Sequence, residues 1–513
     1  MVSPWIITVV LAMATFMEVL DTSVANVSLG HIAGGLGAGL DESTWVLTTY
    51  LVANAVMMPI SGWFGTMLGL KRFYLICVAL FTASSFLCGI ATSLNALIIF
   101  RILQGVGGAG MAPVVQAMLA ELFPPEKRGM AFALYGLAVV FAPAIGPTLG
   151  GWITDNFSWH WIFLINIPVG IVSLVLTALL VREPASTAVE RARLGKNGFR
   201  LDIVGFALSI VGIGCLEFFV DRGEREDWFN SPLILAMAVT SAAALVLLVI
   251  WELRRPDPIV DIPLLRIPSF LASFVMMFAL GFLLFGTTAL LPQFLEQLLG
   301  YTAQRAGMAL TAGGIAMIVM MPLVGGFFVR KFPGRNLVIA GLLMEAAALY
   351  HMTGFTLGIP FEHAAWARVF QTVGLAFLFI PITQAAYANL PTGKSANAAA
   401  LINLARNLGG SVGIALTGTF LAQRSQFHQS RLGESITAYD PAVQQSLQQL
   451  TTLLSTPEKA LALIYQWVQR EAAMLSYIDV FLFMAVGALC IIPLAFFLPS
   501  TIPKADTGET PVH

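Results

Sequence analysis

Long apolar segments recur along the whole chain and are separated by shorter polar stretches. A helix needs about 20 apolar residues to cross the hydrocarbon core of a bilayer, and fourteen segments are about that long. They lie near residues 5–27, 44–64, 73–92, 95–119, 130–153, 159–181, 202–220, 232–251, 268–292, 306–329, 336–357, 364–387, 397–421 and 474–498. The pattern predicts an all-α polytopic membrane protein with fourteen transmembrane helices.

The composition agrees with this prediction and argues against other classes of protein. The 513 residues are 58% hydrophobic and 11% charged, whereas about a quarter of the residues of soluble proteins are charged. The 27 basic and 28 acidic residues leave a net charge of −1, so no basic surplus indicates a nucleic-acid partner. The first apolar segment has no recognisable cleavage site and is interpreted as the first span, not as a signal peptide.

The distribution of Lys and Arg predicts the orientation, because basic residues concentrate in short cytoplasmic loops. If the N-terminus is cytoplasmic, the cytoplasmic loops and the C-terminal tail hold 17 basic residues, and the short outer loops hold three. Both termini are therefore expected on the cytoplasmic side.

An internal repeat organises the spans. The fourth span contains Arg101-x-x-Gln104-x-x-Gly107, and the twelfth contains Arg368-x-x-Gln371-x-x-Gly374, at an offset of 267 residues. The repeat maps each matched span onto the span eight positions later in the chain. A duplication of six spans with nothing inserted would map it onto the span six positions later. We therefore expect a major facilitator fold of two six-helix halves with two inserted spans between them. The predicted parts are an N-terminal half (1–181), a cytoplasmic linker (182–200), two inserted spans (201–255) and a C-terminal half (256–513).

A polar segment, residues 422–473, separates the last two spans and is not apolar enough to cross a membrane. Asp440-Pro441 and Thr456-Pro457 both have the pattern of an N-cap followed by proline at the first helical position. Apolar residues follow each of them at helical spacing. The segment is predicted to form a helical hairpin outside the membrane, with an amphipathic face suited to a periplasmic partner or to packing on the protein itself.

Ionisable residues within the spans are candidates for function, because a charge at mid-bilayer costs at least about 2.5–3.5 kcal/mol. Glu18 and Asp21 lie three residues apart on one face of the first span, and Arg101 lies in the fourth. A buried carboxylate beside a guanidinium can act as a proton switch, although a static ion pair that orders helices has the same signature. The remaining intramembrane charges are Glu217, Glu345, Arg368 and Arg406.

The fifth span contains Pro143, Gly146, Pro147, Gly150 and Gly151. Glycines four residues apart let two helices approach closely, and proline within a helix removes a backbone donor and bends it. This pattern favours a hinge that also packs tightly against a neighbour, but small residues also occur in ordinary membrane helix packing.

Together these motifs resemble the fourteen-span drug:proton antiporters of the EmrB/QacA type within the major facilitator superfamily. The first-span stretch Leu20-Asp21-Thr22-x-x-Ala25-Asn26-Val27 is similar to that group's first-span motif. The other similar stretches are Arg101-x-x-Gln104-Gly105-x-Gly107, Gly146-Pro147-x-x-Gly150-Gly151, and the segment from Trp159 to Gly170 that includes Asn166. The resemblance extends over nearly the whole chain and indicates the EmrB branch.

The resemblance implies a transporter, not an enzyme, that expels hydrophobic and often weakly acidic drugs in exchange for protons and uses no cofactor other than the proton gradient. It implies a location in a bacterial inner membrane, with a periplasmic membrane fusion adaptor and an outer-membrane channel as partners. Proton coupling is assigned to Asp21 and Arg101, with Glu18 as an additional acid. Gln104 and Gln371 are expected to offer polar contacts in an otherwise apolar cavity.

Two positions depart from the family pattern. Thr66 stands where the loop after the second span usually has Asp, and Glu18 adds an acid to the first span. Two alternative functions also remain at this stage: a solute importer or symporter on the same fold, and a membrane sensor or scaffold that transports nothing.

Overall fold

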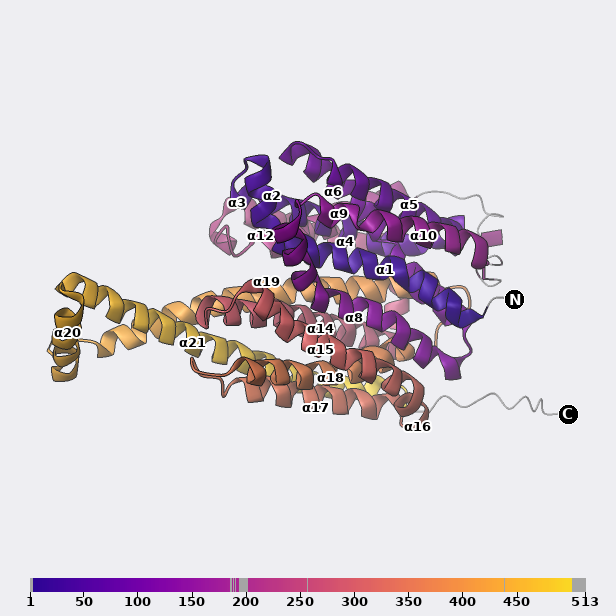
Figure 1. Cartoon of the computed structure of the whole chain (residues 1–513). Coiled ribbons are helices and arrows are strands. Elements are labelled where there is room, and N and C mark those ends of the chain that lie inside the picture. The colour runs from indigo at the N-terminus through magenta and orange to yellow at the C-terminus, as the bar shows by residue number, and fades with distance from the viewer. Residues whose placement is uncertain are drawn as a thin grey trace.

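The structure, a computed structural model, describes residues 3–184, 187, 189, 191, 192, 202–255, 257–437 and 439–500. The described residues form helices and contain no strand. Figure 1 shows a bundle of helices from which two long helices project at one end, and the chain begins at the opposite end. Most of the predicted linker 182–200 lies outside the described residues.

The predicted N-terminal half contains six long helical segments. They are α1 (Pro4–Val27), α4 (Trp45–Leu68), α5 (Leu70–Gly89), α6 (Leu94–Gly108) with α7 (Met111–Leu122), α8 (Pro125–Asn156) and α10 (Asn166–Leu180). The shorter helices α2 (Leu29–Leu36), α3 (Leu40–Ser43) and α9 (Trp161–Leu164) lie in the connections. The predicted fourth span is thus broken into two helices, at Ala109 and Gly110.

The remainder of the chain is also helical. It contains α12 (Ile203–Arg222), α13 (Pro232–Glu252), α14 (Pro268–Gln293), α15 (Ala303–Leu323), α16 (Val329–Lys331), α17 (Gly334–Met352), α18 (Phe361–Ala386), α19 (Ser395–Ser435), α20 (Pro441–Leu454) and α21 (Pro457–Ile491). Single π-helical turns follow Pro292 in α14 and Pro322 in α15, because a proline interrupts the regular hydrogen bonds of an α-helix.

Thirteen helical segments of the described chain are long and apolar enough to cross a membrane. The one predicted span not among these thirteen is the eleventh, 336–357; it corresponds to α17, which is 19 residues long and packs against α18 and α21. Polar residues at its ends and Glu345 within it make α17 less apolar than its neighbours. The prediction of an all-helical membrane fold with about fourteen helices is confirmed.

Glycines allow α14 and α19 to pack with their backbones in contact. A Cβ atom on Gly409 would overlap the carbonyl oxygen of Phe278, and one on Gly413 would lie 2.6 Å from the carbonyl oxygen of Phe282. On the facing helix, a Cβ on Gly281 would overlap the carbonyl oxygen of Arg406. This contact fixes the depth and rotation of Arg406 relative to α14.

The helices of the two predicted inserted spans pack together beside α4 and α19. Ser241 on α13 donates a hydrogen bond to the carbonyl oxygen of Gly212 on α12 (2.8 Å). α12 also contacts α4 and α19. In α13, by contrast, only 22% of the most apolar stretch is buried within the protein. α13 therefore presents most of its surface to the lipid.

In the outer segment the two predicted helix starts are found, and the flanking spans extend into it. Asp440 and Thr456 both occupy the N-cap position, but only the Asp440 side chain accepts a capping hydrogen bond, from the backbone of Ala442. The helices α19 and α21 run without interruption from the bundle into this segment, and α20 lies across their tip (Figure 1). A helix of 41 residues such as α19 is about 60 Å long, about twice the thickness of the hydrocarbon core. Arg424 and His428 on α19 hold α21 through Asp479, at 2.5 and 2.6 Å.

We predict that Gly409→Val destabilises the protein, because the added side chain would push α19 away from α14. Overpacking of this kind costs about 1–3 kcal/mol or more. Gly487→Val on α21 is the matched control, because no atom lies within 4 Å of a Cβ at that position. Thermal unfolding of the purified variants should show a lower midpoint for Gly409→Val alone. Equal midpoints would contradict the close α14–α19 contact.

Candidate functional site

A fully buried ion pair joins α1 and α6. Oδ2 of Asp21 and Nη1 of Arg101 are 2.5 Å apart, and both side chains are 0% exposed. Two opposite charges in a low-dielectric interior stabilise each other strongly, and removal of either would leave the other without a counterion. The pair predicted from the intramembrane charges is therefore present in the structure.

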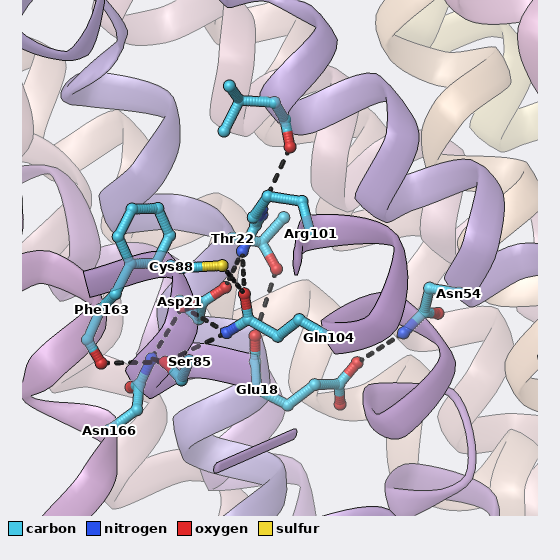
Figure 2. A network of polar contacts seen from close by, with 11 residues as sticks. Glu18, Asp21, Thr22, Asn54, Ser85, Cys88, Arg101, Gln104, Phe163 and Asn166 are labelled. Atoms are coloured by element: carbon cyan, nitrogen blue, oxygen red, sulfur yellow. Dashed lines mark hydrogen bonds and ion pairs between the residues drawn. The ribbon is translucent and has the colours of Figure 1, made fainter. Parts of the chain in front are cut away.

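Neutral polar side chains complete the shell around Asp21 (Figure 2). The Gln104 amide donates to Oδ1 of Asp21 (3.1 Å) and to Ser85 (3.2 Å), and its oxygen accepts from Arg101 (2.8 Å). Asn166 on α10 also donates to Oδ1 of Asp21 (2.7 Å) and to Ser85 on α5 (3.0 Å). The three side chains that contact the Asp21 carboxyl group all donate to it, and an ionised carboxylate offers acceptors only.

The network also binds Arg101 to α4. Its Nε donates to the carbonyl oxygen of Val46 (3.0 Å), and its guanidinium carbon lies 4.1 Å from the centre of the Tyr50 ring. A cation over an aromatic ring gains electrostatic stabilisation. Through Asp21 and Arg101, five helices (α1, α4, α5, α6 and α10) depend on one charge pair.

Glu18 does not belong to this shell, although it lies only three residues before Asp21. One carboxylate oxygen accepts a hydrogen bond from Asn54 on α4 (3.2 Å), and the other has no partner among the described residues. Figure 2 shows the Glu18 carboxylate directed toward Asn54 and away from Arg101. The two acids of α1 therefore have separate surroundings.

The second half of the repeat forms a related network with a different acid. Nη1 of Arg368 donates to Gln371 (2.9 Å), and Gln371 donates to Glu345 on α17 (2.7 Å). The guanidinium also donates to the hydroxyl groups of Thr287 (2.8 Å) and Thr288 (2.7 Å) on α14. Here the glutamine separates arginine from carboxylate, whereas Asp21 contacts Arg101 directly.

The glutamines of both networks are fully buried. Gln104 and Gln371 were expected to contact compounds in the cavity, but the structure places their amides within the two networks. Gly105, beside Gln104, packs on α4, where a Cβ would lie 2.5 Å from the carbonyl oxygen of Tyr50.

The two remaining predicted charges lie apart from these networks. Glu217 on α12 accepts a short hydrogen bond from Ser411 and so joins an inserted span to α19. Arg406 is 4% exposed and has no carboxylate within 4.0 Å among the described residues.

The glycines of the fifth span pack α8 against α1 just beyond Asp21. A Cβ on Gly146 would overlap the side chain of Ser23, and one on Gly150 would lie 3.1 Å from Val24. No atom lies within 4 Å of a Cβ on Gly151. Pro143 and Pro147 lie within a continuous α8, and the carbonyl oxygen of Pro143 accepts a hydrogen bond from Ser23 (3.3 Å).

Four polar residues of the site were not selected as site residues from the sequence: Tyr50, Asn54, Ser85 and Asn166. Asn166 lies in one of the stretches that carry the family resemblance, and this is the sequence signal by which it could have been selected as a site residue. The other three are isolated polar residues within apolar spans, and a buried polar group needs a partner. Their sequence positions alone do not reveal which partner.

The geometry agrees with sequence comparisons. A family profile described as Major Facilitator Superfamily matches residues 11–414. The chain belongs to the Major Facilitator Superfamily. It is 37% identical over 493 residues to the "Multidrug export protein EmrB" of Escherichia coli (strain K12), covering 96% of this chain and 94% of that protein. It is 36% identical over 504 residues to the "Fatty acid resistance protein FarB" of Neisseria gonorrhoeae, covering 98% and 97% of the two chains.

Solved structures support the same fold. The proton:xylose symporter XylE aligns with a TM-score of 0.60 and 14% identity, over 97% of this chain and 96% of that one. The human organic anion transporter MFSD10 aligns with a TM-score of 0.57 and 13% identity, over 94% and 98%. The family profile and the relatives of 36–37% identity together identify a membrane transporter of the EmrB-like branch.

We predict that Gly146→Val inserts normally but transports poorly, because a branched side chain would force α8 away from Ser23 on α1. Gly151→Val is a matched control from the same motif, since the space around Gly151 is open. Transport into inverted membrane vesicles, normalised to the amount of inserted protein, should fall several-fold for Gly146→Val only. Equal rates for the two variants would show that this α1–α8 contact is not required.

Proposed function

We propose that the protein exports hydrophobic compounds from the cytoplasm across a bacterial inner membrane in exchange for protons. Multidrug efflux is supported by 36–37% identity over nearly the whole chain to proteins named for multidrug export and fatty acid resistance. The observation that carries proton coupling is the Asp21–Arg101 pair, because a buried carboxylate with one basic partner is a group whose protonation changes the forces between helices.

The coupling mechanism follows from the contacts of Asp21. A proton on this carboxylate removes the counterion of Arg101 and replaces an acceptor by a donor facing Gln104 and Asn166. The protonated site therefore favours another arrangement of α1, α6 and α10. A compound in the cavity that favours the ionised arrangement is bound in alternation with the proton, which is the requirement for antiport.

In this proposal the end of the bundle where α1 begins faces the cytoplasm, and α20 faces the periplasm. The excess of basic residues in the loops at the α1 end supports this orientation. The resemblance to EmrB-type pumps supports the inner membrane as the location.

Import of a solute together with protons is the alternative on the same fold, as the likeness to a proton:xylose symporter illustrates. The contact of Gly146 and Gly150 with α1 favours export, because this glycine–proline pattern resembles the motif of antiporters. Counterflow in vesicles separates the two directions. A sensor or scaffold without transport would show no substrate movement in either direction.

We predict that Asp21→Asn abolishes transport driven by a pH gradient while compound binding changes by no more than several-fold. The amide keeps the size of the side chain but cannot exchange a proton at physiological pH. Arg101→Ala should impair transport at least as strongly, because it leaves Asp21 buried without a counterion. The measurement is efflux from proteoliposomes of a panel of hydrophobic compounds, with and without a pH gradient.

Glu18→Gln is the internal comparison, because it alters the neighbouring acid of the same helix. Milder loss of gradient-driven efflux is expected for this variant. If Asp21→Asn retained gradient-driven efflux and Glu18→Gln lost it, Glu18 would be the proton carrier.

The partners included in this proposal are a periplasmic membrane fusion adaptor and an outer-membrane channel. The amphipathic face predicted to contact the adaptor is mostly only partly exposed in the structure, and α20 packs against α21. This holds for Val443, Leu447, Leu450, Leu454, Ile464 and Val468, whereas Leu461 of the same face is 56% exposed. Four apolar side chains outside the predicted face are also at least half exposed: Tyr439, Leu453, Tyr465 and Trp467. These residues, at the tip and along α21, are the better candidates for adaptor contact.

We predict that replacing residues 436–456 by a short glycine–serine linker preserves transport in vesicles but abolishes resistance in cells that depend on the adaptor. The exchange removes α20 and leaves α19 and α21 as they are. A point variant, Leu453→Glu, should weaken adaptor binding without removing the helix, because Leu453 is 78% exposed. Full cellular resistance in the linker variant would exclude docking through the tip.

A further inference from the structure

Arg406 is a buried cation whose hydrogen-bonding capacity is largely unused. It lies on α19 and is 4% exposed. It lies eleven positions after Ser395, where α19 starts, and so about 16 Å along the helix, about half the thickness of the hydrocarbon core. Nη2 donates a long hydrogen bond to Asn407 (3.4 Å), while Nε and Nη1 have no partner among the described residues.

The other arginines within spans have more partners and leave one nitrogen each without one, Nη2 of Arg101 and Nε of Arg368. Arg101 has Asp21 and Gln104, and Arg368 has two threonine hydroxyls and Gln371. Buried polar groups nearly always have partners, and a buried guanidinium without one is costly. Two nitrogens of Arg406 therefore lack partners among the described residues, and some state of the transport cycle would be expected to supply them.

Arg406 acts electrostatically on one buried acid of α1, Glu18. Arg406 is the opposite charge that acts most strongly on Glu18, yet the two are not within 4.0 Å. Oε2 of Glu18 and the hydroxyl of Tyr50 also lack partners among the described residues. Glu18, Tyr50 and Asn54 gather around Gly108, where a Cβ would lie 3.0–3.2 Å from their side chains. Polar side chains from α1 and α4 thus meet at Gly108 on α6, and the charge of Arg406 on α19 acts on this group through Glu18.

Aromatic and amide groups line the other side of this region. Tyr135 on α8 lies beside Arg406 and Gln116, and its hydroxyl group pairs with Asn403 (3.4 Å). Its ring stacks on Phe379, with the ring centres 6.2 Å apart. A cation beside an aromatic pair suits a ligand that joins an anionic group to an apolar body.

We propose that Arg406 binds the acidic group of exported organic acids, a carboxylate or phenolate attached to an apolar body. This inference rests on the proposed export function and names one class of its substrates. The planar guanidinium can donate two parallel hydrogen bonds to a carboxylate, and its Nε and Nη1 are unused. Glu18 is the acid on which Arg406 acts, so its negative charge would repel an anion bound at Arg406 and weaken the binding.

The test compares two fluorescent probes that differ only in their head group, 1-pyrenebutyrate and 1-pyrenebutanol. Binding to the full chain in nanodiscs is measured by energy transfer from tryptophan to pyrene, with protein-free nanodiscs subtracted as the lipid background. Arg406→Gln should lower the affinity for pyrenebutyrate roughly tenfold or more, the scale of a lost charge-assisted hydrogen bond. The affinity for pyrenebutanol should change by less than about threefold.

Three further variants make the comparison specific. Arg406→Lys should recover part of the pyrenebutyrate affinity, because it restores the charge without the planar fork. Glu18→Gln should increase this affinity, because it removes the opposing negative charge. Arg424→Gln, an arginine on the same helix but paired with Asp479 in the projecting segment, should leave both affinities unchanged.

Three results would overturn the proposal. Equal loss of both probes in Arg406→Gln would assign Arg406 a structural role, and an unchanged pyrenebutyrate affinity would place the acid elsewhere. Displacement of pyrenebutyrate by inorganic phosphate as effectively as by dodecanoate would show a general anion site without selectivity for an apolar body. Binding is measured without a gradient, so absence of gradient-driven export by the wild-type protein would count against the proposed function alone.

Discussion

A charge buried far from water must be compensated by groups of the protein, and this constraint shapes the N-terminal half around Asp21 and Arg101. The direct contact between the two side chains lets each charge compensate the other. Groups on other helices form the remaining hydrogen bonds to the pair. Ser85 and Asn166 connect α5 and α10 to the pair. Any change in the charge of Asp21 therefore alters the balance of forces among several helices at once.

The two halves share an arginine–glutamine scaffold but differ in how the charge is balanced. The offset that maps Arg101 onto Arg368 also maps Asp21 onto Thr288, so the helix equivalent to α1 provides a hydroxyl instead of a carboxylate. The acid of the second half, Glu345, comes from α17 and reaches Arg368 only through Gln371. A proton on Glu345 would thus disturb Arg368 less directly than a proton on Asp21 disturbs Arg101, which supports placing the main coupling site in the first half.

Much of the fold could be predicted from the sequence, because the bilayer imposes one length and one polarity on every span. The helix starts after Asp440 and Thr456 could also be predicted, because proline at the first helical position is a local signal. The continuity of α19 and α21 was not, because a polar helix outside the membrane has no apolar run to mark it. Asp21 and Arg101 could be identified because a charge within an apolar span carries a large free-energy cost. Ser85 could not, because a single hydroxyl in a membrane helix often bonds to its own backbone.

The helix α1 carries both acids, and its contacts explain how two separated groups can influence one motion. Asp21 is bound to α6 and α10, Glu18 is bound to α4 and acts on Arg406, and Ser23 lies against Gly146 on α8. A proton on Asp21 and an organic anion on Arg406 would therefore both change forces on the same helix. The close contact of Gly146 with Ser23 ties α1 to α8, so a displacement of α1 would be expected to involve α8 as well. In this arrangement the proton and the compound need not touch each other to be coupled, because each acts on the position of α1.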